Sequence, residues 1–282
     1  MPLLRPKTLK IIFFLIVVFI SQAAYCSNQR FISLSPAATE ILFALGLGEL
    51  IVGDTTFCNY PEQALAVPKV GTFSEANIEK VISLNPDIIF ATGLEQAQTV
   101  RRLEQVGLKV FVSDPKNLAE LMQSIIQIGR LTGKESEAEA LVLALQGRID
   151  IIKSKVERIP QDKKPKVFIE IWHDPLMTAG SGSIVDELIA LSGGVNIAND
   201  TQKPYSRFSA EVAIQRNPDV IILGYMTKDN TKDLVSNRFG WKNINAVRNK
   251  RVISDINPDL ILRPGPRIVD GLEEIHKRLY YE

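Results

Sequence analysis

Residues 77–91, NIEKVISLNPDIIFA, decide the fold, because the same pattern returns at residues 209–223 as SAEVAIQRNPDVIIL. Each copy has a capping residue, a glutamate in the first helical turn, a short apolar-faced helix, Asn-Pro-Asp and an apolar run. Proline stops a helix, and such an apolar run is typical of a buried strand in a parallel sheet. The repeat therefore predicts two similar α/β lobes.

A second pair of similar segments strengthens this prediction. Residues 30–53 and residues 166–198 each run from a strand through a loop and a helix to a glycine stop. Between the lobes, residues 118–159 are helical in pattern, and apolar residues at a three-to-four spacing predict one long amphipathic helix. A helix of this length between two lobes behaves as a strut.

The chain therefore has a predicted order of four parts. We expect a signal peptide at residues 1–26 and an N-terminal α/β lobe at 27–115. A helical linker at 116–165 contains the long backbone helix, and a C-terminal α/β lobe occupies 166–282. Both lobes are expected to have central parallel sheets.

The first 26 residues are typical of a secretory signal, since basic residues precede an unbroken apolar run close to the N-terminus. Cleavage fits either after Ala23 or at Cys26 with lipidation, and Tyr25 favours the first because lipoprotein signals usually have a small residue there. Removal of three basic residues changes the formal net charge from +1 to −2. A nearly neutral exported chain gives no electrostatic reason to expect nucleic acid as a partner.

Cys58 stands between two aromatic residues in DTTFCNYPEQA, residues 54–64. A disulfide is not expected, because the other cysteine, Cys26, is removed, lipidated or terminal. A metal site is not expected either, since the chain has two histidines, His173 and His276, far apart in sequence. We interpret Cys58 as a packed or pocket-lining thiol in preference to a nucleophile.

Ligands of open α/β sheets bind beyond the carboxyl ends of the strands, so the loops after each apolar run are candidate binding loops. These loops contain aromatic residues and few charges, which suits a large, flat, partly apolar ligand. Trp172 lines the pocket or fills the space beneath it. Arg263 either forms a surface ion pair or orients an anionic group of the ligand. His276, in the closing helix, is expected to be solvated, and His173 is interpreted as a hydrogen-bonded loop residue.

Six segments together resemble the periplasmic binding proteins of the vitamin B12 and iron-siderophore type. They are ISLSPAATEILFALG, FCNYPEQA, VGTFSEANIEKVISLNPDIIFA, PLMTAGSGSIVDELIALSGGVNI, FSAEVAIQRNPDVII and RPGPRIVDGLEEI. The resemblance runs from Arg30 almost to the C-terminus and is strongest to cobalamin receptors. It implies a class III binding protein, in which one backbone helix joins two lobes. It also implies an ABC importer whose permease dimer receives the ligand.

The same resemblance implies ligand contacts at particular positions. In cobalamin receptors such contacts fall at Pro36, Phe57, Phe73, Tyr205 and Asp259. Phe73 and Tyr205 replace rings that are tryptophans in the best-studied pattern. At Thr92, where that pattern has another tryptophan, one wall of the corrin site differs.

We therefore expect a periplasmic receptor, monomeric and without cofactor or enzymatic activity, that captures cobalamin or a related corrinoid between its lobes. A haem or ferric-siderophore receptor of the same fold remains an alternative. Glu79 and Glu211, the glutamates of the repeat, need no partner, because the helix dipole stabilises a carboxylate in the first turn. The resemblance implies that both dock on permease arginines.

Overall fold

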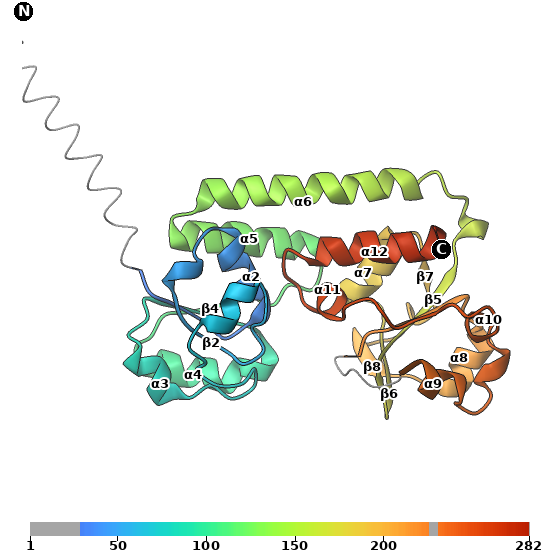
Figure 1. Ribbon diagram of the computed structural model, residues 1–282, viewed down its shortest axis with the longest axis horizontal. Helices are drawn as coiled ribbons and strands as arrows, with labels where there is room; N and C mark the ends of the chain where they lie inside the picture. The colour runs from blue at the N-terminus through green and yellow to red at the C-terminus, as the bar shows by residue number, and fades with distance from the viewer. Residues whose placement is uncertain (1–28, 226–230, 282) are drawn as a thin grey trace, which may run out of the picture. The chain divides into compact units, whose positions relative to one another are not determined.

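The computed structural model of the chain describes residues 29–225 and 231–281 (Figure 1). The chain forms two compact units, the first ending at Ser113 and the second beginning at Asp114. The signal peptide predicted for residues 1–26 lies outside the described residues. Among the helices of the described part, none combines the length and the apolar character needed to cross a membrane.

The first unit is built on a four-stranded parallel sheet in the order β2-β1-β3-β4. Its strands are β1 (Phe31–Ser33), β2 (Ile51–Asp54), β3 (Ile88–Ala91) and β4 (Val110–Val112), and its helices are α2 (Pro36–Ala44), α3 (Ile78–Ser83) and α4 (Ala97–Gln105). The core of this unit is aliphatic and contains Ile32, Leu34, Val70, Val81, Ile89 and Leu103. The predicted parallel α/β lobe is confirmed here.

The second unit contains a six-stranded mixed sheet in the order β10-β9-β5-β6-β8, with β7 also paired to β5. Its strands are β5 (Lys166–His173), β6 (Leu176–Ala179), β7 (Val195–Asn196), β8 (Tyr205–Arg207), β9 (Val220–Leu223) and β10 (Val252–Ile253). The pairs β5–β7, β5–β9 and β9–β10 are parallel, as predicted. The antiparallel strands β6 and β8 were not predicted.

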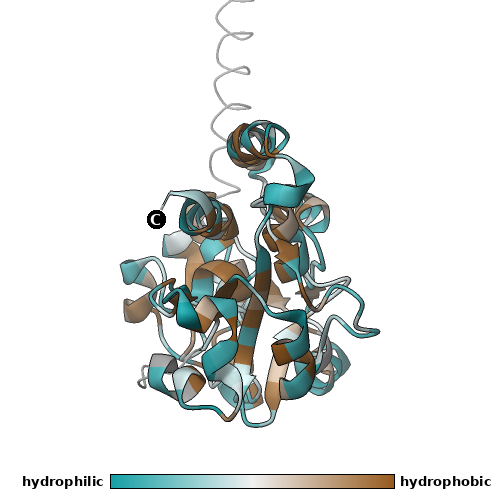
Figure 2. Cartoon of the chain, turned by 90° about the vertical axis from the view of Figure 1, so that its right-hand side faces the viewer, coloured by the Kyte–Doolittle hydropathy of each residue, from teal (hydrophilic) through white to brown (hydrophobic). Residues whose placement is uncertain are grey.

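The helices of the second unit include the two that fill the predicted helical linker. They are α5 (Leu118–Thr132), α6 (Glu135–Val156), α7 (Ile184–Leu191), α8 (Ala210–Arg216), α9 (Thr231–Ser236), α10 (Asn245–Arg248), α11 (Asp259–Leu262) and α12 (Ile268–Tyr280). Gly133 separates α5 from α6 in a left-handed conformation, with φ of 69°, which a glycine adopts without strain. Figure 2 shows hydrophobic colouring concentrated in the central strands of this unit.

The two copies of the sequence repeat adopt the same local structure. In each copy the asparagine of Asn-Pro-Asp is left-handed, with φ of 45° at Asn85 and 48° at Asn217. The following aspartate then accepts a hydrogen bond from a backbone N–H: Asp87 from Arg30 over 2.7 Å, and Asp219 from Lys166 over 2.9 Å. The repeat therefore ends a helix and starts a buried strand in the same way in both units.

Candidate functional site

Two aromatic rings of the first unit meet on the loop that follows β2. Phe57 is 51% exposed, and its ring lies edge-to-face against that of Phe73, with 6.5 Å between the ring centroids. Neither residue belongs to the aliphatic core of this unit. An exposed ring supported by a half-buried one offers an apolar surface to a flat ligand.

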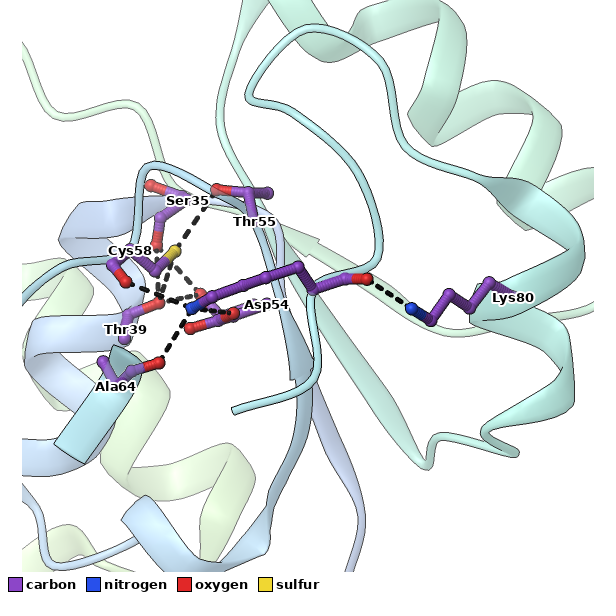
Figure 3. Close-up of polar contacts among 9 residues, drawn as sticks. Ser35, Thr39, Asp54, Thr55, Cys58, Ala64 and Lys80 are labelled. Atoms are coloured by element: carbon purple, nitrogen blue, oxygen red, sulfur yellow. Dashed lines mark hydrogen bonds and ion pairs between the residues drawn. The ribbon is translucent and has the colours of Figure 1, made fainter. Parts of the chain in front are cut away.

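Cys58, next to Phe57, is turned inward and is 1% exposed. The hydroxyl of Thr39 donates a hydrogen bond to its sulfur over 3.1 Å, and the hydroxyl of Thr55 lies 3.3 Å from the same atom (Figure 3). Desolvation by burial raises the pKa of the Cys58 thiol. A buried, protonated thiol is a weak nucleophile, so this geometry fits the predicted packing role.

The half-buried Lys69 holds the loop in place through three polar contacts. The amine of Lys69 lies 2.7 Å from Oδ1 of Asp54 and donates to the carbonyl oxygens of Ala64, over 2.8 Å, and Cys58, over 3.3 Å. Lys80 in turn donates to the carbonyl of Lys69 over 2.6 Å (Figure 3). Despite the ion pair, desolvation raises the pKa of Asp54 to about 6. These contacts hold the turn that presents Phe57.

Gln96 organises a second part of the same surface, and sequence reasoning missed it. Its side-chain N–H₂ donates to the carbonyl oxygens of Leu34 and Phe73, both over 2.7 Å. Its side-chain oxygen accepts the backbone N–H of Thr92 over 3.0 Å. Gln96 is 1% exposed and joins three loops at the carboxyl ends of strands. No local sequence signal indicated this role, because the carbonyl of Leu34 is 62 positions away.

The other first-unit candidates are less accessible. Pro36 is buried at the start of α2, and Thr92 is half-buried at the end of β3. Ser35 occupies the N-cap position of α2 without a side-chain capping bond. Both Pro36 and Thr92 therefore shape the surface more through their backbone than through projecting side chains.

In the second unit, two predicted loop residues lie in strands. Trp172, 42% exposed, and His173 form the end of β5, where they pair with Met177 and Leu176 across the hairpin. The indole N–H of Trp172 donates to the carbonyl of Asp174 over 2.9 Å. Trp172 is thus a surface residue, and the alternative that it fills the space beneath the pocket is wrong for this unit.

Tyr205 lies in β8 and is 43% exposed. Arg207 follows it by two positions and is also exposed, and alternate residues of a strand face the same side. An aromatic ring and a cation are therefore adjacent on one face of the strand. Tyr205 was predicted as a ligand contact and Arg207 was not. The alternation of side chains along a strand Tyr-Ser-Arg would have indicated that Arg207 lies on the same face as Tyr205.

A buried ionic cluster lies below His173. Glu170 accepts two hydrogen bonds from the guanidinium of Arg238, over 2.8 and 2.7 Å, and another from the hydroxyl of Tyr225. Desolvation and the Glu170 carboxylate raise the pKa of Tyr225. The Arg238 guanidinium also lies 4.2 Å from the ring centroid of Trp241.

This cluster forms the floor of an open hollow of about 400 Å³, lined by His173, Asp233, Asn237 and Arg238. Because Glu170 neutralises Arg238, the hollow is not an anion site by charge alone. The imidazole of His173 lies against Trp172, with 5.4 Å between the ring centroids, and edge-to-face against Tyr225 at 5.8 Å. His173 is the exposed titratable ring of this hollow.

Asp259 and Arg263 pair with each other within α11 and its C-cap. The guanidinium of Arg263 lies 2.9 Å from the Asp259 carboxylate, and their side chains are 12% and 18% exposed. Of the two roles predicted for Arg263, the structure therefore shows the ion pair, and the pair is half-buried.

Glu79 and Glu211 occupy the first turns of α3 and α8, as predicted, and both are exposed. Asn77 and Ser209 cap these helices through their side-chain oxygens. The hydrogen bond from Ser209 to the Glu211 carboxylate, over 2.5 Å, lowers the pKa of Glu211. The two carboxylates thus occupy equivalent positions in the two units.

The solvated position predicted for His276 is wrong. His276 is 3% exposed, and its Nδ1 lies 3.0 Å from the carbonyl oxygen of Ser192. The reason is that α12 packs this side against α7. Within residues 29–225 and 231–281, no three His, Cys, Asp or Glu side chains gather into a metal site.

Comparison with known proteins adds an independent line of evidence. A family model described as periplasmic binding protein matches residues 32–258. An uncharacterized ABC transporter substrate-binding lipoprotein of Bacillus subtilis, YvrC, is 36% identical over 258 residues, which cover 89% of this chain and 80% of that protein.

Two solved structures with different ligands are also similar. The periplasmic vitamin B12 binding protein BtuF of Vibrio cholerae has a TM-score of 0.76 and 28% identity, covering 89% of this chain and 96% of that chain. The apo form of the periplasmic haem-binding protein RhuT of Roseiflexus sp. RS-1 has a TM-score of 0.80 and 26% identity, covering 90% and 98%.

Proposed function

Because this chain belongs to the periplasmic binding protein family and is the substrate-binding receptor of an ABC importer, we propose that it captures cobalamin or a related corrinoid. A receptor of this family is not an enzyme, and it works outside the cytoplasm with a membrane permease. The ligand, the docking residues and the mode of export belong to the proposal.

The observation that carries the corrinoid assignment is the exposed ring of Phe57, packed on the half-buried ring of Phe73. The pair projects from a loop fastened by the ion pair of Lys69 with Asp54, so the rings are held ready before a ligand arrives. Trp172 and Tyr205 expose further rings on the second unit. In the proposed complex the corrin ring stacks on these exposed rings, and Asp259 and Arg263 interact with its amide groups.

Haem is the second candidate, and the exposed imidazole of His173 is the observation that favours it. Neutral imidazole is a good ligand for haem iron, whereas a corrinoid already carries its own axial groups. Arg207, on the same face of β8 as Tyr205, could then meet a haem propionate.

A spectral titration of the purified exported protein with cyanocobalamin, cobinamide and haemin tests the assignment. We expect saturable one-to-one binding of a corrinoid. Replacement Phe57→Ala should weaken it about tenfold, since ring stacking contributes about 0.5 to 1.5 kcal/mol beyond buried area. Leu65→Ala, which removes another exposed apolar side chain from the same loop, is the matched control.

A haem receptor would give different results in this titration. Tight haemin binding with a Soret shift that disappears in His173→Ala, together with no corrinoid binding, transfers the assignment to haem. For export, we propose that cleavage after Ala23 releases the chain into the periplasm, with anchoring through Cys26 as the alternative that the lipoprotein relative supports.

A further inference from the structure

The helix α6 carries an apolar stripe that no part of its own unit covers. Its buried side chains pack against α5 and α12, which lie along one side of it (Figure 1). On the opposite side, Leu143 is 76% exposed and Ile151 is 58% exposed. Ala140, Ala144 and Gly147 complete the exposed stripe between and beside them.

The stripe is continuous along the helix. Leu143, Gly147 and Ile151 follow each other at intervals of four residues, and residues so spaced lie on one face of a helix. At Gly147, an added Cβ would meet nothing within 4 Å. Packing inside the chain therefore does not require a glycine there, although glycine is a poor helix former. A glycine flanked by small residues allows a second helix to approach closely.

The charges of α6 are divided between its ends. Glu135 and Glu137 lie in its first turn, and Lys153 and Lys155 lie in its last turn. Glu137 and Lys155 are 18 residues apart, which is about five turns, so they project from the same flank of the stripe. An antiparallel partner with the same sequence would therefore place opposite charges side by side.

We propose that the outer face of α6 binds a second copy of this chain in an antiparallel, two-fold arrangement centred near Gly147. In this arrangement Leu143 packs at the level of Ile151 of the partner subunit, and Glu137 lies beside Lys155 of the partner subunit. A parallel arrangement brings the acidic first turns of the two copies to the same level, which is unfavourable. Such a two-fold contact closes on itself and gives a dimer, in place of the monomer expected from the sequence.

The dimer is a weak one. One helix pair buries less surface than the roughly 1,200 to 2,000 Å² typical of stable interfaces. The alternative occupant, an anionic membrane surface, fits the stripe poorly, because the acidic residues Glu137, Glu139 and Asp150 flank it.

Sedimentation velocity over a concentration series tests the self-association. We expect a reversible monomer–dimer equilibrium for the wild type and at least a tenfold weaker association for Leu143→Lys. Leu131→Lys, which changes an exposed leucine of α5, should leave the equilibrium unchanged. A wild type that sediments as a monomer at every concentration overturns the proposal. So does an equal weakening of self-association in Leu143→Lys and Leu131→Lys.

An exchange of charges tests the antiparallel pairing. Glu137→Arg and Lys155→Glu should each weaken self-association several-fold, while an equimolar mixture of the two variants should recover it as a mixed dimer. Glu137 also pairs with Lys134 over 2.6 Å within the chain, so recovery in the mixture separates the contact between chains from any effect on the helix. Lys163→Glu, an exposed lysine outside α6, is the control. A mixture no stronger than its components contradicts the pairing.

Cysteine cross-linking fixes the register. Gly147→Cys should form a disulfide-linked dimer alone, whereas Leu143→Cys should do so only when mixed with Ile151→Cys. Efficient linkage of Leu143→Cys to itself would indicate a parallel pair and overturn the proposal. So would flotation of the protein with vesicles of phosphatidylglycerol that is abolished by Leu143→Lys.

Discussion

The amine of Lys69 lies 2.7 Å from Oδ1 of Asp54, at the base of the loop that presents Phe57. The second carboxylate oxygen of Asp54 is buried and has no hydrogen-bond partner among the described residues. Burial therefore outweighs the ion pair and raises the pKa of Asp54 to about 6. This pair makes the stability of the first unit dependent on pH in a defined direction.

Asp54→Asn should remove that dependence. The folded-state pKa of about 6 exceeds the ordinary 3.8, so the stabilising contribution of Asp54 is complete below the lower value and is lost as pH rises through the higher one. We expect the free energy of unfolding of the wild type to fall by roughly 2 kcal/mol relative to the variant between pH 4 and pH 7. Urea unfolding at several pH values measures this difference, and parallel pH profiles would show that Asp54 does not titrate as described.

Lys69→Met should destabilise the protein, and more at pH 8 than at pH 5. At the higher pH the variant must bury an unpaired carboxylate or protonate it, which costs about 3 kcal/mol, whereas at the lower pH Asp54 is largely protonated in both proteins. Lys80→Met, which removes one hydrogen bond to the Lys69 carbonyl, is the control and should show a smaller, pH-independent loss. A loss for Lys69→Met that is the same at both pH values contradicts the ion-pair role.

Arg238→Met should destabilise the second unit by about 3 to 5 kcal/mol, because it leaves the buried Glu170 carboxylate without its cation. The emission of Trp241, which is fully buried beside Arg238, reports the change in thermal or urea unfolding. Asp200→Asn removes the exposed partner of Arg216 and should have little effect. Equal effects of the two changes would mean that burial of the Glu170 pair does not matter.

Cys58 should be chemically inert in the folded protein. It is 1% exposed and its pKa is raised, so in a Cys26→Ala background Ellman's reagent should react with it only after unfolding. A serine at this position can still accept the hydrogen bond from Thr39, so Cys58→Ser should bind the ligand within a few-fold of the wild type. Rapid labelling of native protein, or loss of binding by orders of magnitude, would make Cys58 a functional thiol.

The double change Glu79→Arg with Glu211→Arg should abolish uptake while leaving ligand affinity nearly intact. Both carboxylates are exposed at equivalent positions of the repeat, so matched charges could meet the two subunits of a permease dimer. The double change Glu104→Arg with Glu157→Arg, at exposed positions outside the repeat, controls for net charge. Uptake at the wild-type rate would leave both glutamates with a helix-stabilising role alone.

Local signals in the sequence were sufficient for much of the fold. The repeat could be predicted because its helix stop and strand start are encoded within a few residues by Asn-Pro-Asp, and both copies adopt that structure. The long helix could also be predicted, because the apolar spacing from Leu141 to Ile159 is a local signal, and α6 contains most of that run.

Features that depend on distant residues could not be predicted in this way. Gln96 meets a carbonyl 62 positions away, and Arg238 reaches Glu170 across 68 positions, so neither pattern is visible in a sequence window. The hairpin at Asp174 was missed because its proline suggested a loop. His276 was misplaced because the packing of α12 on α7, and not its own neighbours, decides its exposure.

The hydrogen bonds of Arg30 to the first repeat have a consequence for export. Its N–H binds Asp87 and its guanidinium binds the carbonyl of Leu84, so the folded body of the first unit is fixed from this residue onward. Cys26 precedes Arg30 by four residues, a stretch that spans at most about 14 Å. If Cys26 carries a lipid, this short segment keeps the first unit close to the bilayer surface. The receptor then reaches its permease by lateral diffusion in the plane of the membrane. Cleavage after Ala23 gives a receptor that diffuses freely. The position of signal cleavage therefore decides whether the receptor is anchored to the membrane or diffuses in solution.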